Sequence, residues 1–146
     1  MTQGAPQIIA GGTGAAVRLR EELKQSLRSL LPQASNQSVT LVINNAQGEM
    51  IAGISGATSY GWLHIELLWV AEGHRQQGLA RSLLAAAEAQ AHAIGCHDVW
   101  LETSNPAARS CYKKLGYVEF GVLANQDGHE LPDHRRWFFR KAIDTP

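Results

Sequence analysis

The segment from Leu68 to Arg81 has the composition of a site that binds phosphate groups. The apolar run Leu68-Trp69-Val70 is followed by the polar sequence AEGHRQQG and then by a helical pattern that begins at Leu79. A helix that starts directly after a strand and a loop presents unpaired backbone N–H groups and the positive end of its dipole, and both attract anions. Strand-loop-helix units that bind nothing share this arrangement, so the loop alone leaves both interpretations open.

Two small residues favour the binding interpretation of this loop. Gly78 and Ala80 leave the backbone accessible, because a β-carbon at position 78, or a large side chain at position 80, would hold an anion away from the N–H groups. The predicted anion site consists of Arg75, Gln76, Gln77, Gly78, Leu79, Ala80 and Arg81.

A second informative stretch runs from Thr103 to Tyr117. Asn105 can cap a helix, Pro106 suits its first turn and Gly116 ends it. Tyr112 lies within this helix, and its phenol, with a reference pKa of about 10, stays protonated at neutral pH and can donate a proton to a leaving group. The alternatives are a core aromatic for Tyr112 and a plain helix cap for Asn105.

Both stretches match motifs of one protein family. Arg75-x-x-Gly78-x-Ala80 resembles the acyl-CoA diphosphate motif of the GNAT family of N-acetyltransferases, which is written Gln/Arg-x-x-Gly-x-Gly/Ala. The second stretch resembles the other family signature, Asn-x-x-Ala-x-x-x-Tyr-x-x-x-Gly-Phe/Tyr, with Asn105, Ala108, Tyr112, Gly116 and Tyr117 in register. The resemblance covers roughly residues 39 to 143, and the closing segment is similar to a subgroup of compact bacterial acetyltransferases.

The resemblance implies a fold, a co-substrate and roles for named residues. The fold is α/β (α+β), with a central, mixed, mostly antiparallel sheet flanked by helices and two central strands splayed apart. Acetyl-CoA would be the co-substrate, its pantetheine arm paired with the main chain of Leu68, Trp69 and Val70 and its acetyl oxygen near the N–H of Val70. Asn105 would bond the pantetheine arm or the acetyl region, and Tyr112 would protonate the departing thiolate.

The general base has several candidates in the sequence. A substrate ammonium with a pKa near 10 is almost fully protonated at pH 7, so a proton must be removed before the amine can attack. Glu102, at the end of the second splayed strand, matches the position of the base in some relatives. Glu66 lies on the first splayed strand and ranks nearly level, and His64 ranks third. A paired structural charge is the alternative for either carboxylate.

Two further chemistries are disfavoured by residue spacing. An acyl-cysteine intermediate on Cys111 is disfavoured because no histidine lies at helical spacing to activate its thiol. The six histidines show no spacing typical of metal ligands, so we expect no metal.

Hydrophobic periodicity predicts the elements that position these residues. An amphipathic helix is expected from Ala16 to Leu31, ended by Pro32, and the preceding residues 1–15 are expected to be weakly structured. The remaining expected strands are 38–44, 50–57, 62–70, 98–102, 118–123 and 136–143, and the remaining helices start at Leu79 and Pro106.

Length and composition limit the function classes. A chain of 146 residues corresponds to one domain. Its formal net charge of zero argues against nucleic acid and against an anionic membrane surface as partners. The N-terminus lacks the pattern of a signal peptide, no segment approaches a membrane span, and we expect a cytoplasmic protein with reduced thiols.

The sequence does not identify the acceptor. The leading hypothesis is N-acetylation of a primary amine of a small molecule by direct attack in a ternary complex. The alternatives are N-terminal or lysine acetylation of proteins, and a non-catalytic CoA-binding sensor or interaction protein. A homodimer formed through the last strands, or through Trp137 and Phe139 if these are exposed, is a further possibility.

Overall fold

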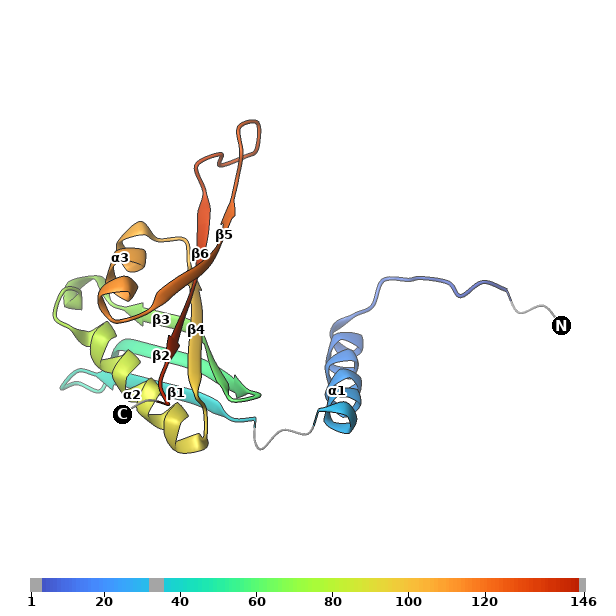
Figure 1. Ribbon diagram of the computed structural model, residues 1–146, viewed down its shortest axis with the longest axis horizontal. Helices are drawn as coiled ribbons and strands as arrows, with labels where there is room; N and C mark the ends of the chain where they lie inside the picture. The colour runs from blue at the N-terminus through green and yellow to red at the C-terminus, as the bar shows by residue number, and fades with distance from the viewer. Residues whose placement is uncertain (1–3, 32–35, 145–146) are drawn as a thin grey trace. The chain divides into compact units, whose positions relative to one another are not determined.

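The computed structural model describes residues 4–31 and 36–144, which fall into two compact units, Met1–Ala34 and Ser35–Pro146. The first unit contains helix α1 (Thr13–Leu30), which begins three residues before the expected start at Ala16. Its sequence suits a helix, with charged residues spaced to pair along one side, as in Arg18–Glu22 at 3.9 Å. The rest of the fold belongs to the second unit (Figure 1).

The second unit is built on one six-stranded sheet of order β1-β2-β3-β4-β6-β5. All neighbouring strands are antiparallel except β3 and β4, which are parallel. This confirms the expected mixed, mostly antiparallel sheet. The strands are β1 (Ser38–Asn44), β2 (Met50–Ser59), β3 (Trp62–Val70), β4 (Asp98–Thr103), β5 (Val118–Ala124) and β6 (Arg135–Ala142).

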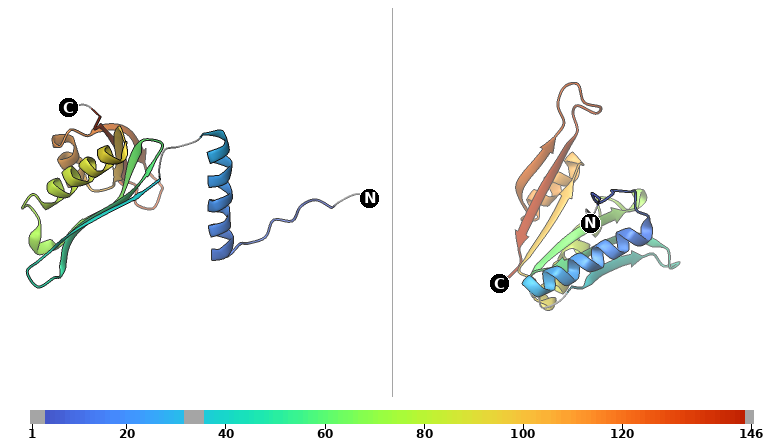
Figure 2. Two further views of the ribbon diagram at one scale, coloured as in Figure 1. Left: turned by 90° about the horizontal axis from the view of Figure 1, so that it is seen from below. Right: turned by 90° about the vertical axis from the view of Figure 1, so that its right-hand side faces the viewer.

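Two helices cover one face of this sheet. Helix α2 (Leu79–Ile94) follows a short 3-10 helix, η1 (Glu72–His74), and packs on β1, β2 and β3; α3 (Pro106–Lys114) packs on β4 and β5. Figure 2 shows α2 running across one side of the first strands. The core between helices and sheet holds the side chains of Leu63, Ile65, Leu83, Leu84, Ala87, Val99, Leu101, Tyr112, Tyr117, Trp137 and Phe139. We call the opposite side of the sheet its open face.

The face assignments correct one expectation about β6. Trp137 and Phe139, expected to be exposed, are buried, with 9% and 0% of their surface accessible. Phe138, between them, is only half-buried. Successive strand residues point to opposite faces, and register decides which face is the core: Phe139 pairs with the buried Leu101 of β4.

The central pair of strands separates along its length. Strands β3 and β4 are in register at only three positions, of which His64 and Trp100 form the last. Beyond this pair the two strands diverge. The register between β2 and β3 shifts at the same place, because Ser55 pairs with Leu67 and Gly56 pairs with Ile65. Glu66 is therefore the extra residue of a β-bulge, which bends β3 where it leaves β4.

Gly56 makes this bulge possible. A β-carbon added at Gly56 would overlap the backbone carbonyl oxygen of His64. Only glycine lets the two backbones approach this closely. The bend in β3, and with it the gap between β3 and β4, therefore depends on the absence of a side chain on β2.

Candidate functional site

The predicted anion loop has the backbone geometry of an anion site. Gln76 and Gly78 both have positive φ, at 62° and 77°, and Gly78 is the residue before the first turn of α2. No side chain caps this helix end. Among the residues that the structure describes, the backbone N–H groups of Gly78, Leu79, Ala80 and Arg81 have no hydrogen-bond acceptor. Unpaired N–H groups beside left-handed residues form a concave, electropositive surface.

The space in front of this loop is free. A β-carbon added at Gly78 would meet no protein atom within 4 Å. Gly73, earlier in the same loop, is equally unobstructed but has no positive φ. Gly78 is therefore required by its backbone conformation and by access to the N–H groups, and not by packing against the protein.

Arg75 connects the loop to the end of β3. Its Nε donates a hydrogen bond to the carbonyl oxygen of Val70 at 3.0 Å. This contact fixes the direction in which the chain leaves the strand. The sequence predicted Arg75 as an anion-binding residue, but no sequence pattern indicated its bond to Val70, because such a bond depends on how the loop folds back.

The stretch Leu68, Trp69 and Val70 borders the gap. These three residues pair with β2, at Ile54, Gly53 and Ala52, but have no partner on the β4 side. Backbone groups that point toward the gap are therefore free to bond an inserted extended chain. This is the position that the resemblance assigned to the pantetheine arm.

Tyr112 reaches the core from α3. It is 8% exposed, and its ring lies 5.8 Å from the rings of both Tyr117 and Phe139. Burial raises the pKa of its hydroxyl above the ordinary value, and the neighbouring Cys111 acts in the same direction. The phenol therefore holds its proton through the neutral range, as a proton donor must.

The sequence of the chain matches the model of a known protein family. The model described as Acetyltransferase (GNAT) family matches residues 15–117. The chain belongs to the GNAT acetyltransferase family.

Individual relatives agree with this assignment. An acetyltransferase of Agrobacterium fabrum is 35% identical over 91 residues, which cover 62% of this chain and 66% of that protein. The blasticidin-S acetyltransferase of Streptomyces morookaense is 40% identical over 72 residues, 49% of this chain and 53% of that protein. The chain thus spans about half to two thirds of these curated relatives. A crystal structure of an Agrobacterium tumefaciens protein described as an acetyltransferase has a TM-score of 0.82 and 26% identity, covering 96% of this chain and 99% of that one.

The candidate bases of this GNAT domain lie on the open face. Leu63 and Ile65 of β3 and Val99 and Leu101 of β4 are buried under the helices, so alternation places His64 and Trp100 on the opposite side. Glu66 and Glu102 each follow two residues later on the diverging strands, and both are exposed. The structure therefore brings these two carboxylates to the two edges of the gap, near its beginning.

His64 is stacked rather than free. Its ring is parallel to that of Trp100, with centroids 3.7 Å apart and 3° between planes. Its Nε2 is buried and has no hydrogen-bond partner in the described part of the chain. This nitrogen is out of reach of a substrate, whereas Glu66 and Glu102 are both exposed.

Asn105 takes the structural role that the sequence allowed. Its side-chain oxygen accepts a hydrogen bond from the N–H of Ala107 at 2.9 Å and so caps α3. Its own N–H donates to the hydroxyl of Thr103. The cap orients the helix that carries Tyr112.

Sequence reasoning missed a polar cluster at the other end of β3 and β4. Asp98 accepts from His97 Nδ1 at 2.7 Å and from Arg140 at 3.3 Å. The Arg140 guanidinium also lies 4.9 Å from the ring centre of Trp62. His97 and Asp98 are adjacent in the sequence, but Arg140 and Trp62 come from distant strands, so no sequence signal linked the four.

The described residues include neither a cluster suited to a metal ion nor a membrane-spanning helix. Within residues 4–31 and 36–144, no group of three or more His, Cys, Asp or Glu side chains is placed to hold a metal ion. None of the described helices is long and apolar enough to cross a membrane.

Proposed function

We propose that this GNAT domain is an acetyl-CoA-dependent N-acetyltransferase that acetylates a primary amine of a small molecule by direct attack in a ternary complex. One observation carries the proposal: the gap that begins beyond His64 and Trp100 opens beside an uncapped helix N-terminus with unpaired N–H groups. An extended amide-bearing arm with a diphosphate tail fits both features.

The residues present fit acetyl-CoA. The N–H groups of Gly78 to Arg81 would hold the diphosphate, and the free backbone of Leu68 to Val70 would pair with the pantetheine amides. Gly78 presents open space on its ligand side. The co-substrate supplies an activated acetyl group as a thioester.

The chain's own groups would handle the protons of the reaction. Glu66 or Glu102 would take a proton from the ammonium, directly or through water, so that the nitrogen lone pair can attack the carbonyl carbon. The N–H of Val70 would stabilise the charge that develops on the carbonyl oxygen. As the carbon–sulfur bond breaks, Tyr112 would give its proton to the thiolate.

The curated relatives support a small acceptor. One is named as an acetyltransferase of the antibiotic blasticidin S, although this chain spans only about half of that protein. The exposure of both carboxylates on the open face suits an amine that arrives from solvent.

A coupled assay tests this proposal. Purified protein, acetyl-CoA and a library of primary amines would be followed by detection of free thiol, with thermal melting measured in parallel. We expect acetyl-CoA to raise the melting temperature and at least one amine to release thiol above the hydrolysis background. Absence of both effects at millimolar acetyl-CoA would overturn the proposal.

A matched pair of glycine variants locates the binding site of the co-substrate. Gly78→Val should weaken acetyl-CoA binding by about tenfold or more, because its side chain would occupy the space before the N–H groups. Gly73→Val, also unobstructed by protein but without positive φ, should leave binding within about twofold of the parent. Equal effects of the two substitutions would argue against the loop as the diphosphate site.

A further inference from the structure

The open face beside the gap carries aromatic side chains on neighbouring strands, which we call the aromatic strip and define as His64, Trp100, Phe138 and Phe120. His64 and Trp100 are stacked, as described above. Phe138 pairs in register with Glu102, so it lies diagonally next to Trp100 on the same face. Phe120 continues the row on β5, with its ring 6.1 Å from that of Phe138.

Within the second unit, the aromatic strip is accessible. Phe120 is 55% exposed, and Trp100 and Phe138 are half-buried. The helices α2 and α3 cover the other face of the sheet. Across the gap, Leu67 and Trp69 of β3 add exposed apolar surface, at 69% and 47%. Exposed apolar side chains grouped next to the proposed reaction centre suit the binding of an apolar part of a ligand.

The charges around the strip limit what can bind there. Glu66 and Glu102, at the edges of the gap, suit a single ammonium group. On the other side of Trp100, in register with it on β6, lies Arg140. Because this guanidinium is paired with Asp98 at 3.3 Å, that carboxylate is not free to bind a second cationic group, and a neutral ring needs no such partner.

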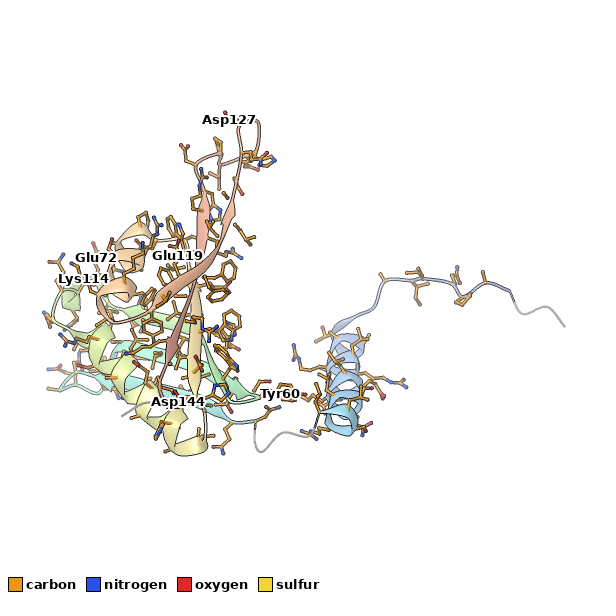
Figure 3. The ribbon with its side chains drawn as sticks, viewed as in Figure 1. Tyr60, Glu72, Lys114, Glu119, Asp127 and Asp144 are labelled. Atoms are coloured by element: carbon orange, nitrogen blue, oxygen red, sulfur yellow. The ribbon has the colours of Figure 1, made fainter. Side chains whose placement is uncertain are left out.

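The acidic residues that could attract a polycation lie elsewhere. Asp127, Glu130 and Asp133 belong to the connection between β5 and β6. Figure 3 shows Asp127 at the tip of this hairpin, away from the body of the sheet. A chain of several ammonium groups would therefore find its further carboxylates, beyond Glu66 and Glu102, at the hairpin tip.

We propose that the acceptor carries a flat conjugated ring, aryl or nucleobase-like, next to its primary amine, and that the aromatic strip selects it. The ring lies against the strip while the amine reaches the gap between Glu66 and Glu102. Aromatic side chains bind flat rings through offset or edge-to-face contacts, which add binding free energy beyond that from the buried apolar area. This inference rests on the proposed acetyltransferase function and narrows its acceptor.

Pairs of amines with equal charge test the selectivity. Thiol release would be measured with 2-phenylethylamine against 2-cyclohexylethylamine, which have similar size but differ in flatness and conjugation. A second pair is 5′-amino-5′-deoxyadenosine against spermidine. We expect kcat/KM to be at least about tenfold higher for the ring-bearing member of each pair. Equal or higher kcat/KM for the saturated amine or spermidine would overturn the inference.

Two variants assign the selectivity to the strip. Phe138→Ala and Phe120→Ser should each raise KM for the ring-bearing amines, by about tenfold and threefold, with kcat and the acetyl-CoA melting shift retained. Val42→Ser on β1 removes an equally exposed apolar residue, 52% accessible, and should change none of these values. If neither aromatic substitution raises KM, the strip does not bind the acceptor.

The outcomes separate this inference from the proposed function. Turnover of aliphatic amines with no preference for rings overturns the inference and leaves the acetyltransferase proposal intact. If none of the amines causes thiol release, and acetyl-CoA does not shift the melting temperature, both the inference and the proposed function are overturned. Turnover confined to ring-bearing amines supports both.

Discussion

The two ends of the β3–β4 pair have opposite properties. One end, which we call the closed end, begins with Trp62 and Asp98. Here the strands are in register, and their side chains take part in hydrogen bonds and ring contacts. There Asp98 accepts hydrogen bonds from His97 and Arg140, and Arg140 stacks on Trp62. At the open end, beyond His64 and Trp100, the strands have no registered pairs and both glutamates are exposed.

This difference assigns separate tasks to the two ends. Satisfied hydrogen bonds and ion pairs stabilise a fold, whereas unpaired backbone and exposed carboxylates are available to ligands. Substitutions at the closed end should therefore change stability with little effect on turnover by the folded protein. Substitutions at the open end, and substitution of the proposed proton donor Tyr112 on α3, should change turnover or binding.

The largest expected effect concerns Tyr112. Tyr112→Phe should lower kcat about 100-fold or more, because general acid catalysis typically contributes a factor of that size. Thermal melting should still respond to acetyl-CoA. Tyr117→Phe is the matched control, since its ring lies 5.8 Å from Tyr112 and it loses the same atom. Steady-state kinetics on both variants would reject the assignment if they lost activity equally or if Tyr112→Phe lost none.

The bulge in β3 that separates the two ends can be disrupted by a substitution at Gly56 on β2. Gly56→Ala should reduce the free energy of unfolding by about 2 to 3 kcal/mol, because its methyl group would overlap the carbonyl oxygen of His64, and backbone cannot move aside cheaply. Gly53→Ala, on the same strand, has its nearest neighbour, a Val42 methyl, at 3.4 Å and should stay within about 0.5 kcal/mol of the parent. Urea titrations of the two variants would separate these cases.

The closed end should respond to a change of one charge. Asp98→Asn retains the shape of the side chain but weakens the bonds to His97 and Arg140, which should cost about 1 to 2 kcal/mol of unfolding free energy. The kcat of the folded variant should stay within about threefold of the parent. Asp127→Asn, at the hairpin tip, is the control and should change neither quantity. A tenfold loss of kcat in Asp98→Asn would show that the two ends are not separable.

The smallest expected effect is a gain in stability. The hydroxyl of Tyr117 is buried with no hydrogen-bond partner among the described residues. Tyr117→Phe removes this unpaired group and should stabilise the protein by about 1 kcal/mol. A loss of stability would show that the hydroxyl has a partner.

Tyr117→Phe should also change how thermal stability depends on pH. Burial, and next the charge of Glu88, raise the pKa of the Tyr117 hydroxyl. A raised pKa in the folded state means that the associated stability is complete below the unfolded-state pKa of about 10 and is lost as pH rises through the folded-state value. Thermal melting between pH 9 and 11 should therefore fall less steeply for Tyr117→Phe than for the parent.

Much of the fold could be predicted from the sequence because its patterns are local. Helix α2 follows from the recurrence of Leu79, Leu83, Ala87 and Ala91, and in the structure it begins at Leu79 as expected. Strands β1 and β3 also begin and end where expected. The left-handed conformation of Gly95 follows from its place after the last helical turn.

The remaining features depend on pairing between distant segments. Trp137, Phe138 and Phe139 are all aromatic, so alternation in that run cannot tell which face is buried, and the expectation that Trp137 and Phe139 are exposed was wrong. The bulge at Glu66 depends on the register with β2. Gly56, a glycine inside a strand, was the one local sign that two backbones come close there.

The most direct test of the account is a crystal structure of the protein with acetyl-CoA or CoA. We predict the diphosphate against the N–H groups of Gly78 to Arg81, the pantetheine arm between the diverging strands, and the sulfur beside the Tyr112 hydroxyl. A diphosphate bound elsewhere, or a sulfur far from Tyr112, would contradict the account.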